Sequence, residues 1–207
     1  MMRLSLFALL LADFAAIPAA GEMPASGDYL SDAYVAFLKE SHSPLAALKR
    51  NFSPQIISVE NGRIVEHINW HEGCTIHPAQ ECPDAKSLNS NDKDEVTLKG
   101  VTYRLTSDPD TVIGAIVLGG EYVDERGKLY RFDDRGTATF PDRSFRYELC
   151  LEQVGPPCGG ADMFYDKGTG ALYAFKRDAG SLLIFAGPAD ESGEVDFTKP
   201  LLRLKAK

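Results

Sequence analysis

Apolar and polar residues alternate over much of the second half of this chain. Large apolar residues take every second position of Ser144–Leu151, namely Phe145, Tyr147, Leu149 and Leu151. Successive side chains of a strand point to opposite faces, so this period of two predicts a strand with one buried face. Turns rich in Asp and Gly separate it from the runs before it. The stretch Thr111–Leu151 therefore predicts four consecutive strands, the first of which is the almost wholly apolar Thr111–Tyr122.

Further short strands are predicted on both sides of that stretch. The Asn61-Gly62 pair, a strong hairpin signal, joins Ile56–Val59 to Arg63–Trp70. The other predicted strands are Val96–Thr106, Asp162–Tyr165, Ala171–Lys176, Ser181–Ala186 and Leu201–Leu204. Parallel strands need long crossovers, which are missing between these runs, so we expect an antiparallel sheet. A mainly β fold follows, in which an up-and-down meander of about ten strands closes as a barrel, with a sandwich as the alternative.

Helical patterns occur near the N-terminus. After a polar leader, Ser31–Glu40 carries an apolar stripe at helical spacing behind a serine that can cap a helix. Ser43 followed by Pro44 is a favourable start for a second short helix. These features predict three parts: a signal peptide in 1–20, a leader and helical arm in 21–54, and an antiparallel β domain in 55–207.

The first twenty residues have the composition of a secretory signal peptide. Arg3 precedes the apolar run Leu4–Leu11, and small residues follow it. The run is too short for a membrane-spanning helix, which needs roughly 20 apolar residues. We therefore expect a secreted or periplasmic protein without stable membrane insertion after cleavage.

Four cysteines form two pairs with identical spacing, Cys74 with Cys82 and Cys150 with Cys158. An even number of cysteines in an exported chain predicts disulfides, and the two local pairings are the ones we favour among the three possible. A four-cysteine zinc site is the alternative, but such sites usually have more closely spaced pairs. No metal and no cofactor is predicted.

The formal net charge of −8 restricts the partners. Nucleic-acid binders need a basic face, so this charge argues against them, and it also disfavours attachment to anionic lipid. An acidic surface could bind a basic protein partner, although such surfaces also serve solubility alone.

The densest group of polar side chains lies in Glu66–Gly73, where His67, Asn69 and His71 would share one face of a strand. These three residues are our candidates for ligand binding. A metal site that adds His77, with Glu72 as a base, is the sharper alternative. Strand geometry opposes it, because His67 and His71 would lie about 13 Å apart.

Aromatic residues of the predicted barrel supply the second candidate site. Tyr122 and Tyr147 could line an apolar cavity and offer hydroxyl groups to a ligand. Gly119 and Gly120, inside the first predicted strand, are expected to mark a bulge or bend. No catalytic serine motif and no phosphate-binding glycine loop occurs in the sequence, so no catalytic residue is assigned.

The meander of short hairpins resembles the lipocalin-like (calycin) barrels at the level of architecture. The Gly-x-Trp signature of that family is absent near the first predicted barrel strand, and a helical arm comes first. The resemblance implies a binding module for a small apolar or amphipathic ligand. Two alternatives stay open: an acidic interaction or inhibitor domain, and a metal-assisted hydrolase centred on His67 to His77.

Overall fold

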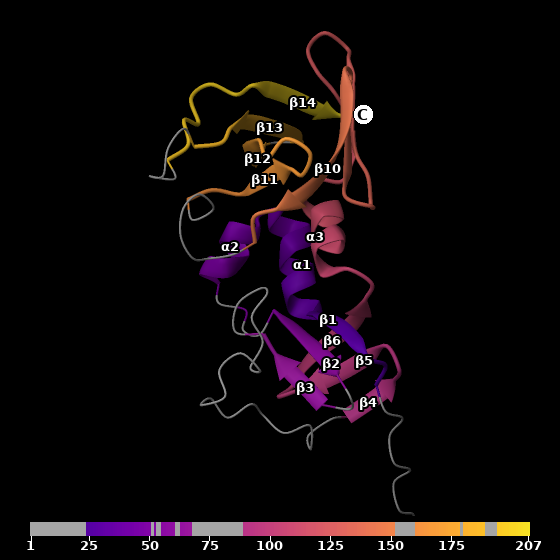
Figure 1. Ribbon diagram of the computed structural model, residues 1–207. Coiled ribbons are helices and arrows are strands. Elements are labelled where there is room, and N and C mark those ends of the chain that lie inside the picture. The colour runs from indigo at the N-terminus through magenta and orange to yellow at the C-terminus, as the bar shows by residue number, and fades with distance from the viewer. Residues whose placement is uncertain are drawn as a thin grey trace, which may run out of the picture.

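The computed structural model describes residues 24–50, 52, 55–60, 63–67, 89–151, 160–178, 180–188 and 194–207. Within this part of the chain, a closed barrel, a layer of helices and a six-stranded sheet follow one another along the molecule (Figure 1). The mainly β, antiparallel architecture is confirmed. The strands are divided between two sheets, however, and the barrel contains only those from residue 120 onward.

The six-stranded sheet has the order β3-β2-β1-β6-β5-β4, with every pair antiparallel. Its strands are β1 (Gly27–Ser31), β2 (Ile56–Glu60), β3 (Arg63–Glu66), β4 (Asn89–Asp92), β5 (Glu95–Leu98) and β6 (Val101–Thr106). The predicted hairpin of β2 and β3 is confirmed. The interpretation of Val96–Thr106 as one strand is wrong, because Lys99 and Gly100 have φ values of 51° and 80° and turn the chain back on itself.

The segment before the helices is also a strand, although we expected a polar leader there. β1 pairs with β2 on one side and β6 on the other, so it lies inside the sheet. Tyr29 and Leu30 are both buried, one on each face. Polar residues make this strand difficult to recognise in the sequence. Ser31 is one of them: it is the last residue of β1 and also caps the following helix.

The two predicted N-terminal helices are confirmed. In α1 (Asp32–Ser41), the Ser31 hydroxyl accepts a hydrogen bond from the backbone N–H of Tyr34. In α2 (Pro44–Lys49), the Ser43 hydroxyl accepts one from Ala46 at 3.0 Å. Both helices lie between β1 and β2 in the sequence, so they are an insertion in the sheet and not an appendage before it.

The apolar run Thr111–Tyr122 is not a strand, and this prediction is wrong. Its first seven residues belong to α3 (Pro109–Val117), whose N-terminus is capped by the Asp108 carboxylate, and only Gly120–Tyr122 lies in a strand. Aspartate followed by proline is a helix start, and an apolar run buried on several sides has no period that separates helix from strand. Gly119 and Gly120 therefore mark no bulge or bend inside a strand: Gly119 lies in the link after α3, and Gly120 begins the first barrel strand.

Each barrel strand pairs with the next one along the chain, and the last pairs with the first. The strands are β7 (Gly120–Val123), β8 (Leu129–Phe132), β9 (Thr137–Phe140), β10 (Arg143–Leu149), β11 (Met163–Asp166), β12 (Leu172–Asp178), β13 (Ser181–Ala186) and β14 (Leu202–Ala206). The up-and-down closure is thus confirmed, with eight strands in place of about ten. This is the architecture that lipocalin-like barrels share.

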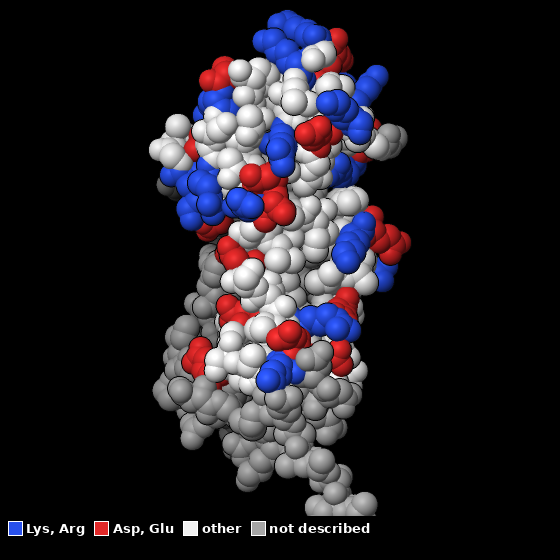
Figure 2. Space-filling view, turned by 90° about the vertical axis from the view of Figure 1, so that its right-hand side faces the viewer, with Lys and Arg blue, Asp and Glu red and all other residues white. Residues whose placement is uncertain are grey.

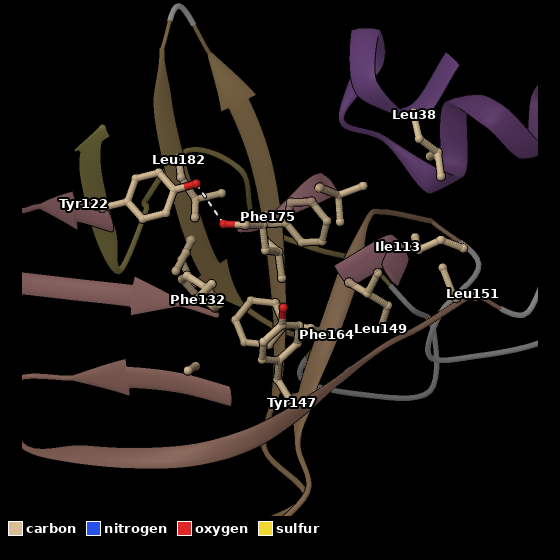
Figure 3. Packing of buried hydrophobic residues seen from close by; sticks show 14 of the residues in the cluster. Leu38, Ile113, Tyr122, Phe132, Tyr147, Leu149, Leu151, Phe164, Phe175 and Leu182 are labelled. Atoms are coloured by element: carbon tan, nitrogen blue, oxygen red, sulfur yellow. Dashed lines mark hydrogen bonds between the residues drawn. The ribbon is translucent and has the colours of Figure 1, made fainter. Parts of the chain in front are cut away.

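Aromatic rings fill the barrel interior (Figure 3). The ring of Phe164 lies 5.8 Å from that of Phe132 and 6.0 Å from that of Tyr147, with edge-to-face geometry in both pairs. Phe164 is fully buried. Contacts of this kind occupy the space that a ligand cavity would need.

Helix α3 contacts the barrel, and Arg177 of β12 joins the two. The Arg177 guanidinium donates to the carbonyl oxygen of Val117, at the end of α3, from both Nε and Nη2. Nη2 also donates to the Tyr122 hydroxyl at 2.5 Å. A cation at the C-terminus of a helix stabilises its dipole. Among the described residues, no helix combines the length and apolar character needed to cross a membrane.

Candidate functional site

A row of polar side chains crosses three neighbouring strands of the six-stranded sheet. Asp28 on β1 lies directly opposite Ser58 on β2, so their side chains share a face. Ser58 in turn lies opposite Val65 on β3. His67 is two residues beyond Val65 and therefore also points to this face.

Short hydrogen bonds join the row. The Ser58 Oγ lies 2.5 Å from Asp28 Oδ1 and 2.6 Å from His67 Nε2. A hydroxyl has one proton, and an ionised carboxylate is the stronger acceptor, so Ser58 donates to Asp28 and accepts from the His67 Nε2–H. This direction differs from that of a serine hydrolase, in which the histidine accepts the serine proton.

An open groove of about 540 Å³ runs beside this row. Its described lining consists of Ser26, Gly27, Asp28, Ser58, Val59 and Glu60. The groove begins where the helices end, because Leu30 and Ile56, the next residues on this face, pack into the helical core. Two carboxylates and two hydroxyls therefore face one hollow, and the described lining contains no Lys or Arg.

Thr106 of β6 extends the polar surface on the other side of Asp28, its partner in the sheet register. Its buried Oγ1 has no hydrogen-bond partner among the described residues. Buried hydroxyls are usually hydrogen-bonded, so such an atom calls for an explanation. Asp28 is thus flanked by a bonded hydroxyl and an unbonded one.

The chemistry of the groove suits a cation or a donor of hydrogen bonds. Carboxylates accept hydrogen bonds and attract positive charge, and hydroxyls can adapt to either role. In the part of the chain that the structure describes, no cluster of three or more His, Cys, Asp or Glu residues could hold a metal ion.

Of the candidates predicted around the histidines, the structure describes one. His67 lies in the polar row, bonded to Ser58. Asn69 and His71 lie outside the described residues, as do Glu72 and His77.

Tyr122 and Tyr147 lie together in the barrel core and not in the polar row. The Tyr122 hydroxyl donates to the carbonyl oxygen of Leu118 at 2.7 Å (Figure 3). Burial raises the pKa of both phenols, and for Tyr122 the nearby Arg177 opposes this rise. Their role in binding a ligand stays a prediction.

Two members of the row escaped the sequence reasoning. Asp28 lies in the segment that we expected to be a leader. Ser58 was detectable in principle, since it interrupts the apolar run Ile56–Val59 and is 4% exposed. A lone hydroxyl inside a buried strand signals a partner on a neighbouring strand.

The predicted cysteine pairs fall mostly outside the described residues, which include only Cys150. This residue follows β10 and packs against the cluster on the outer wall of the barrel that contains Met163 and Phe185. Cys74, Cys82 and Cys158 are not described, so the pairing stays a prediction.

Comparisons with known proteins identified no relative. No family model, no curated protein and no solved structure matches this chain.

Proposed function

We propose that this protein is an exported binding module that holds a positively charged, amphipathic group in the groove beside Asp28. The observation that carries the proposal is the pairing of the Asp28 and Glu60 carboxylates in one groove whose described lining has no basic residue. Export rests on the signal-peptide pattern of residues 1–20. Kinship with lipocalin-like proteins beyond the shared architecture belongs to the same proposal and rests on strand order alone.

The groove is a better candidate than the barrel interior. Aromatic side chains occupy the interior, and the Tyr122 hydroxyl is engaged with backbone carbonyls and Arg177. A ligand there would have to displace close-packed rings. The groove needs no such rearrangement, because it is open to solvent.

Positive charge is favoured over other ligand chemistry by the surroundings of Asp28. Its Oδ1 accepts the hydrogen bond from Ser58, which orients the carboxylate. Glu60 is exposed and lies on the same face, two residues beyond Ser58. An ammonium group between these carboxylates would gain charge-assisted hydrogen bonds. The group could belong to a small amine or to a lysine of a basic protein partner.

Calorimetric titration can test the proposal with n-octylamine, which is cationic at neutral pH, and n-octanol, its neutral counterpart. We expect the amine to bind at least about tenfold more tightly than the alcohol, because one hydrogen bond to a charged group contributes that much affinity. Asp28→Asn keeps the shape and the bond to Ser58 but should reduce this preference, because only the Glu60 carboxylate then remains in the groove. The control Glu40→Gln changes an exposed carboxylate on α1 and should leave both affinities unchanged.

A tetralysine peptide separates the two sources of the charge. Binding of this peptide without octylamine binding, again weakened in Asp28→Asn, would indicate a basic protein partner. Equal affinities for octylamine and octanol, or an unchanged affinity in folded Asp28→Asn, would refute the proposal.

A further inference from the structure

The outer wall of the barrel carries a strip that combines basic and apolar side chains, which we call the basic strip. It spans three adjacent strands, β14, β7 and β8, and the turn between the last two. Its members are Val123, Arg126, Lys128, Leu129, Arg131, Leu201, Arg203 and Lys205. The sheet register places Lys205, Val123 and Leu129 side by side across the three strands.

Both of the large apolar residues that are exposed in the described part of the chain belong to this strip. Leu129 is 46% exposed and Leu201 is 58% exposed. They lie two residues before Arg131 and Arg203, respectively, so each leucine shares the outward face with an arginine. An exposed apolar side chain next to a cation is the composition of surfaces that bind at the boundary of a membrane.

The basic side chains of the strip outnumber the acidic ones beside them, which are Glu121, opposite Arg131 in the register, and Asp124 and Glu125 in the turn. None of its five Lys and Arg residues forms an ion pair with another described residue. Nearby, Glu121 pairs with Lys207 at 3.6 Å, and Asp124 accepts backbone hydrogen bonds from Arg126 and Lys128. Figure 2 shows several Lys and Arg side chains over the barrel end of the molecule, with Asp and Glu side chains between them.

The net charge of −8 does not oppose a local basic surface. Residues 120–207 contain 13 of the 22 Lys and Arg residues and 15 of the 30 Asp and Glu residues, a net charge of −2, against −6 for residues 1–119, so any basic surface on the barrel is local. The acidic groove lies in the other sheet, beyond the helices (Figure 1). Salt screens exposed charges over about 8 Å, which is less than the width of one helix, so the two ends act almost independently.

We propose that the basic strip docks the protein on the surface of a bilayer that contains anionic lipid. The arginines and lysines would contact lipid phosphates, and Leu129 and Leu201 would enter the region between headgroups and acyl chains. A bilayer fits this surface better than an acidic protein does. The outer wall of a barrel is convex, and a fluid membrane can adapt to it without a complementary shape.

A fluorescent reporter can test the docking in the full-length chain. In a Trp70→Phe background, which removes the single tryptophan, Leu129→Trp places a reporter in the strip. Ala36→Trp places a matched reporter on an exposed position of α1. With vesicles of equal parts phosphatidylcholine and phosphatidylglycerol, brominated acyl chains should quench the first reporter and not the second. Vesicles of phosphatidylcholine alone should quench neither.

Charge variants sharpen the test. Arg203→Gln with Lys205→Gln should weaken vesicle binding of the Leu129→Trp reporter about 30-fold, since each basic side chain near an anionic surface contributes roughly fivefold. The control pair Lys39→Gln and Lys49→Gln removes the same charge from the helices and should change binding little. Equal quenching of both reporters, absence of quenching, or binding to soluble poly-L-glutamate without quenching by vesicles would each overturn the proposal, and the last would indicate an acidic protein partner.

Discussion

The barrel and the six-stranded sheet are both antiparallel, but they differ in where their hydrogen-bonded polar groups lie. Inside the barrel, the polar tips of Tyr122 and Arg177 bond to each other and to the end of α3. In the sheet, Asp28 and Ser58 bond to each other beside an open groove. A closed barrel has no strand edges and surrounds its core, whereas an open sheet can expose one face. We therefore expect the barrel to contribute most of the stability, and the proposed ligand site lies in the sheet.

The two regions are nevertheless coupled. One continuous apolar cluster extends from the barrel rings through α1 to Leu30 and Ile56 on the sheet. A second cluster, built around Tyr29 and Ile57, belongs to the sheet alone. We therefore expect the barrel core to support the whole molecule, and the polar row of the sheet to be expendable for folding.

The largest effect should come from Phe164→Ala. This ring is fully buried and contacts the rings of Phe132, Tyr147 and Tyr173. Its removal should lower the free energy of unfolding by about 3–5 kcal/mol, measured by urea denaturation followed by circular dichroism. The control Leu129→Ala, at an exposed position, should cost less than about 0.5 kcal/mol. A loss below about 1 kcal/mol in Phe164→Ala would show that the barrel interior is not close-packed.

A smaller effect on stability is expected at two carboxylates, one of which joins the barrel to α2 while the other lies within the barrel wall. Asp162 accepts a hydrogen bond from the backbone of Leu45 in α2, whereas Asp166 pairs with Arg143 inside the barrel wall. Burial raises the pKa of Asp162 above 3.8 despite hydrogen bonds from Ser43 and Leu45. Burial also acts to raise the pKa of Asp166, but hydrogen bonds from its own turn and the charge of Arg143 lower it overall.

These opposite shifts predict opposite dependences of stability on pH. The contribution of Asp166 is present above pH 3.8 and is lost as the pH falls below that value, so Asp166→Asn should flatten the acid side of the profile. The contribution of Asp162 is present below pH 3.8 and is lost as the pH rises, so Asp162→Asn should flatten the profile above that value. Urea midpoints measured across this range check both variants. Parallel profiles for the two variants would contradict the assignment.

The smallest effect on stability should come from Ser58→Ala. It removes the hydroxyl between Asp28 and His67, both of which are only partly buried, and should cost about 1 kcal/mol. The control Thr97→Ala changes a half-buried hydroxyl on β5. If Ser58→Ala cost more than about 3 kcal/mol in urea denaturation, the polar row would be a structural element, and the contrast between the two regions would fail.

Local sequence patterns were sufficient to predict much of the barrel. The turns after β7 and β8 each end in a glycine with positive φ, Gly127 and Gly136, and β10 alternates as predicted. They failed where apolar residues are buried on several sides, as in α3, and where polar neighbours conceal a strand, as in β1. In both places the packing partners come from remote parts of the chain, and no short window of sequence contains them.

The candidate site shows the same division. His67 could be selected from the sequence because it belongs to a dense group of polar residues, and the capping serines of α1 and α2 follow from the same local reasoning. Asp28 and Ser58 are separated by 30 residues, and they meet only because β1 and β2 pair in one particular register. Turns, caps and alternation act within a few residues, so the chain specifies them locally. The groove depends on strand pairing over long distances, and that pairing is a property of the folded molecule as a whole.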